Sequence, residues 1–331
     1  MESEVELEKN ILRTLCWFSL FAYPLTSFEL WKWMLREEGV WKGEYDIGAR
    51  EYGFPKKNEK KKWKLEDVLQ ILEKSEFLKK YLEEKNGFFC LKKYGSISDH
   101  IKKRQAGFLD ASRKIKKLRR VMWWFRLFPS VEAVAACNTL GWFLTNPRSD
   151  IDLFIVVRPG TIWTTRLFLV FPFMLLGKRP GQKKKDPFCF SFFLTSDALC
   201  FESFLLPGGD PYFAYWTVSL FPLFDRKHIF SSLLKQNSWT EDYLPQAFFR
   251  FEEEYFFEEH SVGQNFLQKR NKNYFESFAK WMQMRHFPQT LRDLANKDSR
   301  VVITDQTLKF HENDRRAYYR EVWHKRCKEI L

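Results

Sequence analysis

The stretch AACNTLGWFLTNPRSDIDLFIVVRP, residues 135–159, places two aspartates at the start of an apolar run. Asp150 and Asp152 precede residues 153–157, whose apolar and β-branched composition predicts a buried strand. Because a strand alternates its faces, carboxylates at i and i+2 leave on the same side. Like charges that close repel each other, so a cation between them is favoured. A single D-x-D also occurs at solvent-exposed strand ends and as a turn cap, so its context decides between these interpretations.

The ligand type predicts which cation would bind. Two carboxylates, with water or phosphate completing the shell, are hard oxygen ligands of the kind that Mg²⁺ prefers. A zinc site would instead use Cys and His at characteristic spacings. The six cysteines lie far apart and form no C-x-x-C pair. Most of them fall inside apolar runs, which is typical of reduced core thiols in a cytoplasmic protein.

A predicted turn lies just upstream of the aspartates. Residues 131–137 predict a strand, which is followed by Asn138, Thr139 and Gly141. This arrangement resembles the signature of the DNA polymerase β-like nucleotidyltransferases, in which a strand ends in Gly-Ser, a short helix follows and the next strand carries Asp-x-Asp. The close match covers about residues 129–160. More loosely, the whole chain is similar to a bacterial group in which a winged helix precedes such a domain, including the stretches DPYFAYWTVSLFPLFD (210–225) and LKFHENDRR (308–316).

The resemblance implies an Mg²⁺-dependent transferase that moves a nucleoside monophosphate from an NTP to a hydroxyl acceptor. Asp150 and Asp152 would be the catalytic residues and the metal ligands, and Thr139 would hold phosphates with its hydroxyl. Asn138 stands where the family has glycine, and Asn tolerates the left-handed backbone that such a turn requires. The nucleotide site that the resemblance implies consists of Asn138, Thr139, Gly141, Ser149 and Ser191.

The third carboxylate of the family is missing at its expected position. It would lie on the next strand, predicted at 187–196, where the residue in register is Ser191. Asp186, Asp197 and Glu202 flank this strand, and each would need an irregular backbone path to reach a metal. Because the third acid helps to activate the attacking hydroxyl, its loss would slow or abolish transfer. The alternative is therefore a catalytically degenerate fold that binds nucleotide or nucleic acid as a regulator.

The rest of the chain predicts an α+β protein in four blocks. Residues 1–97 combine three helices, a basic insert after the second, and a hairpin at Asn86-Gly87, which predicts a winged helix. Residues 98–128 predict a basic helical connector. Residues 129–245 carry the nucleotidyltransferase-like mixed sheet with flanking helices. Residues 246–331 predict a mostly helical region with one short strand, RVVITD.

Composition limits the classes of protein and partner. The 331 residues are 45% hydrophobic and 18% aromatic, which indicates a globular chain. The net charge of +13 favours an anionic partner such as nucleotide phosphate, nucleic acid or a membrane surface, although a solvated basic surface would give the same charge. The acidic start, MESEVELEKN, lacks the features of a signal peptide, which favours the cytoplasm.

The longest apolar run, residues 167–177, predicts a buried helix and no membrane insertion. It is too short to span a bilayer, and it contains Pro172. In a helix over 161–177, we expect a face that packs on the sheet, formed by Trp163, Leu167, Val170 and Met174.

Overall fold

The computed structural model describes residues 2–36, 62–178, 185–247 and 274–331. The amino-terminal unit contains the three predicted helices and the hairpin, and also a short helix at Glu76–Tyr81 that was not predicted. Thr26 and Glu29 form the expected capping box: Thr26 Oγ1 accepts from the Glu29 backbone N at 3.3 Å, and Glu29 accepts from the Thr26 backbone N. Asn86 and Gly87 form the hairpin turn with φ of 55° and 74°. The elements of this unit are α1 (Glu2–Ser19), β1 (Leu25–Thr26), α2 (Ser27–Lys32), α3 (Leu65–Lys74), α4 (Glu76–Tyr81), β2 (Leu82–Lys85), β3 (Phe88–Leu91) and η1 (Lys92–Tyr94).

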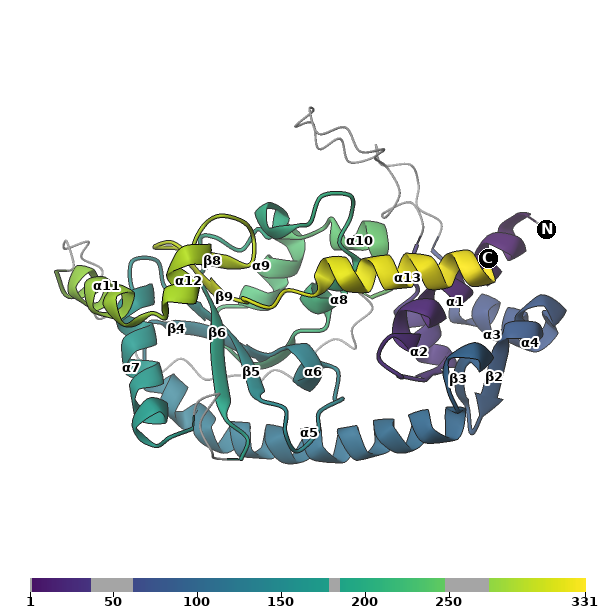
Figure 1. Ribbon diagram of the computed structural model, residues 1–331, viewed down its shortest axis with the longest axis horizontal. Coiled ribbons are helices and arrows are strands. Elements are labelled where there is room, and N and C mark those ends of the chain that lie inside the picture. Colours follow the sequence, from purple (N-terminus) through teal and green to yellow (C-terminus); the bar gives the residue numbers. More distant parts are fainter. Residues whose placement is uncertain (1, 37–61, 179–184, 248–273) are drawn as a thin grey trace.

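The small sheet of this unit has the order β1-β3-β2, with both pairs antiparallel. From it, α5 (Ile97–Arg126) runs 30 residues along one edge of the molecule (Figure 1). This helix covers most of the segment for which the sequence predicts a helical connector, 98–128. It links the hairpin to the far end of the larger sheet, and its inner residues pack against that sheet. The basic insert predicted after the second helix lies largely outside the described residues.

The larger sheet is mixed and open. Its order is β7-β4-β5-β6-β9-β8, and every neighbouring pair is antiparallel except β5-β6. The chain is therefore α+β, as expected from the sequence. The strands are β4 (Val131–Ala136), β5 (Ile151–Val157), β6 (Phe188–Thr195), β7 (Phe221–Asp225), β8 (Val301–Ile303) and β9 (Thr307–Phe310).

Each face of this sheet is covered by helices and has its own apolar core. One core contains residues of α5, α7, α11 and α12. The other contains residues of α8, α9, α10 and α13, and also of the amino-terminal helices. The amino-terminal unit and the sheet therefore share a core. The remaining elements are α6 (Asn138–Gly141), α7 (Ile162–Leu175), η2 (Glu202–Phe204), α8 (Pro211–Val218), α9 (Ile229–Gln236), α10 (Thr240–Tyr243), α11 (Tyr274–His286), α12 (Gln289–Leu294) and α13 (Arg316–Ile330).

The carboxy-terminal region returns to both earlier parts of the chain. The predicted strand RVVITD forms β8, and the sequence analysis missed β9, which joins β8 to β6. The final helix, α13, then packs along α1, where Trp323 Nε1 donates to the Arg13 carbonyl at 3.0 Å. The part of this block between 248 and 273 lies outside the described residues.

The prediction of which α7 residues face the sheet is partly wrong. Trp163 and Val170 are buried as expected, but Met174 is 45% exposed. Leu169 and Phe173 occupy the buried positions instead. No helix in the described part of the chain has both the length and the apolar character needed to cross a membrane.

Candidate functional site

The turn after β4 brings the predicted nucleotide-binding residues to the start of β5. Asn138 has φ of 53°, the left-handed conformation that a glycine would adopt there. The Cys137 backbone N donates to the Asp152 carbonyl at 3.2 Å, which ties the end of β4 to β5. Thr139 is exposed beside this junction. The sequence therefore folds the turn and the D-x-D into one corner of the sheet.

Gly141 supports this turn through packing. A Cβ at Gly141 would lie 2.8 Å from the carbonyl oxygen of Ser219, which is backbone and cannot move aside easily. Only glycine lets α6 approach the segment after α8 this closely. The close approach holds α8 beside the turn, so Gly141 shapes the site through backbone packing.

Asp152 lies in a polar network that includes Asn138. The Asn138 amide donates to the Asp152 carboxylate, and its Oδ1 accepts from Trp216 Nε1 at 2.9 Å. Burial raises the pKa of Asp152 to about 6, and the charge of Asp150 adds to the increase, while the hydrogen bonds to Asn138 and Cys189 lower it. Burial also raises the pKa of Asp150. A cation placed between these two carboxylates would relieve the cost of charging both.

Lys114 of α5 holds the loop that leads to these aspartates. Its side chain is fully buried, and its Nζ donates to the carbonyls of Asn146 and Ser149 at 2.6 and 2.7 Å and to Ser149 Oγ at 2.8 Å. An ion pair with Asp110 at 3.0 Å balances its charge. Ser149, predicted to bind nucleotide, is thus part of the loop's internal structure. The ammonium group also lowers the pKa of Asp150 and of Asp152.

The residue opposite Asp152 on β6 is Cys189, and Ser191, predicted for the third-acid position, lies two residues further along the same strand. An irregularity in the β5-β6 ladder between Asp152 and Phe154 shifts the pairing, and no pattern of apolar residues reveals such a shift. The Cys189 thiol donates to Asp152, and Ser191 donates to the Cys189 sulfur. Burial, with the Asp152 charge, raises the pKa of Cys189 to about 12, so the thiol is neutral. Ser191 reaches the network through Cys189.

Two of the acids that flank β6, Asp186 and Asp197, have other partners. Asp186 accepts two hydrogen bonds from Arg113 of α5, at 2.6 and 2.7 Å, and pairs with Lys117. Asp197 lies beyond the opposite end of the strand, where it accepts from Thr195 Oγ1. Arg158 also lies at that opposite end and donates to the Pro129 carbonyl at 3.1 Å.

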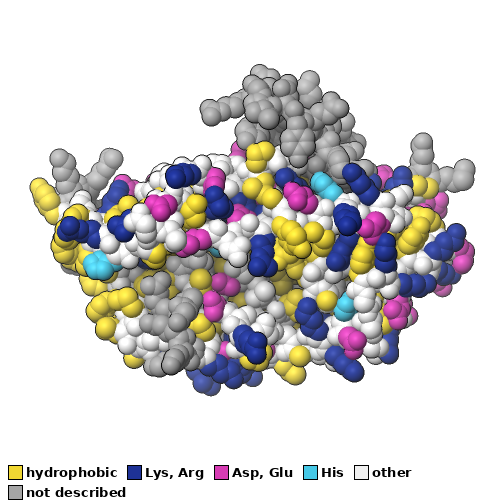
Figure 2. Space-filling view, in the orientation of Figure 1, with side chains coloured by type: hydrophobic (Ala, Val, Ile, Leu, Met, Phe, Trp, Pro, Cys, Tyr) yellow, Lys and Arg dark blue, Asp and Glu magenta, His cyan; other side chains and the backbone are white. Residues whose placement is uncertain are grey.

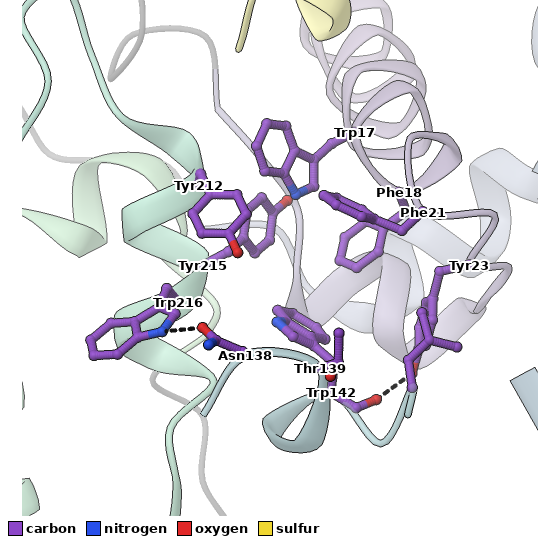
Figure 3. Close-up of a pocket in the computed structure, with 11 residues that line it drawn as sticks. Trp17, Phe18, Phe21, Tyr23, Asn138, Thr139, Trp142, Tyr212, Tyr215 and Trp216 are labelled. Atoms are coloured by element: carbon purple, nitrogen blue, oxygen red, sulfur yellow. Dashed lines mark hydrogen bonds between the residues drawn. The ribbon is translucent and has the colours of Figure 1, made fainter. Parts of the chain in front are cut away.

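An aromatic pocket opens beside the turn, between α1, α6 and α8 (Figure 3). Its cavity volume is about 90 Å³. Asn138 and Thr139 provide its polar side, and the Tyr212 hydroxyl points into it. Trp17 and Tyr215 stack at 5.4 Å and 13° to form part of its wall. The full lining is Trp17, Phe18, Phe21, Tyr23, Asn138, Thr139, Trp142, Leu144, Tyr212, Tyr215 and Trp216.

Tyr212 connects this pocket to two charged groups. Burial raises its pKa, and the charges of Asp152 and Asp314 contribute, so its hydroxyl lies within electrostatic range of both. Asp314 belongs to a buried cluster in which Arg316 pairs with Asp210 at 2.6 Å and with Asp314 at 2.7 Å. The stretches 210–225 and 308–316, quoted for the family resemblance, thus meet beside the candidate site. Their position next to the acid pair could not be read from spacing along the chain.

Two carboxylates at this corner could hold a cation. Asp150 and Asp152 supply two hard oxygen donors, and Cys189 stays protonated and adds no charge. Within the described ranges, no group of three or more His, Cys, Asp and Glu side chains has metal-binding geometry. Comparison with protein-family models, with curated proteins and with solved structures found no match.

Proposed function

We propose that the protein is an Mg²⁺-dependent nucleotidyltransferase of the DNA polymerase β-like type. One observation carries the proposal: the left-handed turn at Asn138-Thr139 and the pair Asp150 and Asp152 meet at one corner of a mixed sheet. The local order of strand, turn, short helix and D-x-D strand is the order of that superfamily. The parallel strand β6 beside β5 also lies where the superfamily carries its third acid.

Mg²⁺ held by Asp150 and Asp152 would neutralise the phosphates and stabilise the charge that develops on the attacking and leaving oxygens. In the reaction, the acceptor oxygen forms a bond to the α-phosphorus, and the bond from that phosphorus to the bridging oxygen breaks. Pyrophosphate leaves, and the proton of the acceptor hydroxyl passes to water. Thr139 donates its hydroxyl to the phosphates, while the Asn138 amide fixes the Asp152 carboxylate.

The aromatic pocket supports a substrate that carries a planar ring. Its walls are aromatic, and aromatic side chains bind rings by stacking. Asn138 forms part of the pocket and also contacts Asp152, so a ring bound there would place an attached polar group near the acids. A nucleobase with its ribose and phosphates matches this combination of a flat apolar seat and a neighbouring metal site.

We further propose that the amino-terminal unit is a winged helix used for packing within the protein. Its order of helices, small sheet and hairpin is the winged-helix order. The exposed side of α3 carries Glu66 and Glu73 together with Lys74, so it does not offer DNA phosphates a uniformly positive surface. Its first helix instead packs on α13 and lines the aromatic pocket. This disfavours a function as a DNA-binding regulator.

A second candidate function is nucleotide binding without transfer. The specific observation in its favour is Cys189, a neutral thiol that faces Asp152 from the strand where the superfamily carries its third acid. A site with two acids depends on the nucleotide to bring in the metal with its own phosphates. Such a site would bind Mg²⁺ and NTP together and release no pyrophosphate.

Transfer can be tested with α-³²P-labelled NTPs, Mg²⁺ and a fractionated cell extract as the source of acceptors. We expect label in one fraction, with pyrophosphate release, and loss of both in Asp152→Asn. Asp197→Asn is the matched control because Asp197 lies beyond the other end of β6. Binding of NTP with no label transfer in any fraction would favour the second candidate, and absence of both binding and transfer would reject the two together.

A further inference from the structure

The end of the molecule opposite the amino-terminal unit has an unusually apolar surface. Two neighbouring helices, α7 and α11, each present large side chains outward at helical spacing. We call this surface the outer apolar face. Figure 2 shows hydrophobic side chains at this end of the molecule. The outer apolar face consists of Phe168, Phe171 and Leu175 of α7 and Tyr274, Phe278 and Trp281 of α11, with exposures from 45% to 85%.

The two stripes form one continuous surface. The ring of Phe168 stacks on Phe275 of α11, with centroids 5.8 Å apart and an interplanar angle of 6°. Phe278 stacks on Trp281 at 5.9 Å. Only Ala279 and Gln283 of α11 are buried, so most of its aromatic side chains face away from the protein. An exposed apolar surface of this extent on a folded protein indicates a binding surface.

The charges around the outer apolar face indicate which kind of partner it can bind. Residues 153–178, which include all of α7, contain no Asp or Glu. The single acid of α11, Glu276, accepts from the backbone N atoms of Trp163 and Thr164 at 2.7 and 2.9 Å and is thereby engaged at the start of α7. The nearby Asp305 forms an ion pair with Lys280 at 2.6 Å. Both of these described acids therefore have partners within the protein.

The adjoining half of α5 supplies positive charge. It contacts α7 through Phe125, whose ring centroid lies 6.4 Å from that of Phe173. Residues 111–131 contain no Asp or Glu, and Lys116 and Arg120 are exposed. Trp123 on the same half is 61% exposed. Aromatic and aliphatic side chains bordered by Lys and Arg match an interface between lipid headgroups and acyl chains.

We propose that the outer apolar face binds the surface of an anionic lipid bilayer. The exposed side chains of α7 and α11 enter the headgroup region, and the basic residues of α5 contact acidic headgroups. Neither helix crosses the bilayer, so high salt releases the protein from the membrane. The partner is a negatively charged lipid surface. Binding to this surface brings the aromatic pocket, on the opposite side of the sheet, near a membrane, and the pocket itself does not enter the bilayer. The inference does not depend on the proposed transferase function.

Co-sedimentation with lipid vesicles tests the proposal. We expect the full-length protein to pellet with vesicles of phosphatidylcholine containing 30% phosphatidylglycerol at low salt, and to bind vesicles of pure phosphatidylcholine at least tenfold more weakly. The double variant Phe171→Ser with Leu175→Ser should lose at least tenfold in affinity for the anionic vesicles. Lys116→Glu with Arg120→Glu should weaken binding and flatten its salt dependence. Tyr318→Ser is the control, because Tyr318 is 60% exposed on α13, away from this face.

Three results would overturn the proposal. The first is no sedimentation with anionic vesicles at low salt. The second is equal sedimentation of wild type and the Phe171, Leu175 double variant, with thermal unfolding showing that both are folded. The third is light scattering that shows a dimer without lipid which this double variant converts to a monomer, because a second copy of the chain would then cover the face.

Discussion

Replacement of Cys189 by aspartate tests whether this position is the third carboxylate position of the site. Cys189 lies directly opposite Asp152 in the parallel β5-β6 ladder, and its thiol already donates to that carboxylate. An aspartate there would add a negative charge beside Asp152 and Asp150. We therefore expect Cys189→Asp to destabilise the metal-free protein and to strengthen Mg²⁺ binding.

The size of the effect follows from the strand geometry. Side chains opposite each other on neighbouring strands lie about 5 Å apart. Two unit charges at about 5 Å with an effective dielectric constant of about 20 repel by roughly 3 kcal/mol. Burial already disfavours the charged form of Asp152 and raises its pKa. The added repulsion should therefore lower the unfolding temperature of Cys189→Asp by roughly 5 °C or more. Bound Mg²⁺, at a concentration of about 100 times its Kd, would raise the free energy of unfolding by about 2.7 kcal/mol.

Thermal unfolding with and without 10 mM MgCl₂, together with calorimetric titration of Mg²⁺, measures both effects. Cys189→Ser is the control, since it changes the size of the group little and adds no charge. We expect Mg²⁺ to stabilise Cys189→Asp well beyond wild type, with no such gain for Cys189→Ser. If the aspartate variant is as stable as wild type without metal and binds Mg²⁺ no better, Cys189 does not face the acid pair and the register is wrong.

Three further predictions concern the support of the site. Lys114→Met should cost roughly 3 kcal/mol in urea unfolding, because it removes the buried ammonium that pairs with Asp110 and leaves the carbonyls of residues 146 and 149 without their donor. Gly141→Ala should cost about 1–3 kcal/mol in the same assay, since its Cβ would meet the Ser219 carbonyl at 2.8 Å; an unchanged urea midpoint would contradict the packing. The pKa of Asp152, about 6 when folded, lies above its unfolded value of about 3.9, so the native state binds the proton more tightly. The stability of the metal-free wild type should therefore fall, relative to Asp152→Asn, as pH rises from about 4 to about 6, and parallel urea midpoints for the two proteins over pH 4–7.5 would refute this shift.

Local patterns in the sequence predicted most of the elements around the site. The turn residues Asn86 and Gly87, the capping pair Thr26 and Glu29, and the apolar run within 187–196 each specify structure over a few residues, and the structure has the turn, the capping box and the strand that they predict. Asn138 likewise adopts the left-handed backbone expected of an asparagine in place of glycine. These features depend on backbone preferences that short segments carry by themselves.

The features that the sequence did not predict depend on contacts between distant segments. The shift that places Cys189 opposite Asp152 is an irregularity in a ladder between two strands. Lys114 donates hydrogen bonds to carbonyls that lie 32 and 35 residues further along the chain. The basic sequence around Lys114 does not indicate that its side chain is fully buried. The aromatic pocket needs α1, α6 and α8 together. Helical spacing predicted that Met174 lies on the buried face of α7, but Leu169 and Phe173 are the residues buried there.

Calorimetric titration of each NTP in the presence and absence of Mg²⁺, with wild type and Asp152→Asn, tests the central claim most directly. We expect that at least one NTP binds with Mg²⁺, that the affinity falls at least tenfold without the metal, and that Asp152→Asn loses the metal-dependent part of binding. The contradicting result would be that no NTP binds wild type with Mg²⁺, or that Asp152→Asn binds Mg²⁺ and NTP as tightly as wild type does.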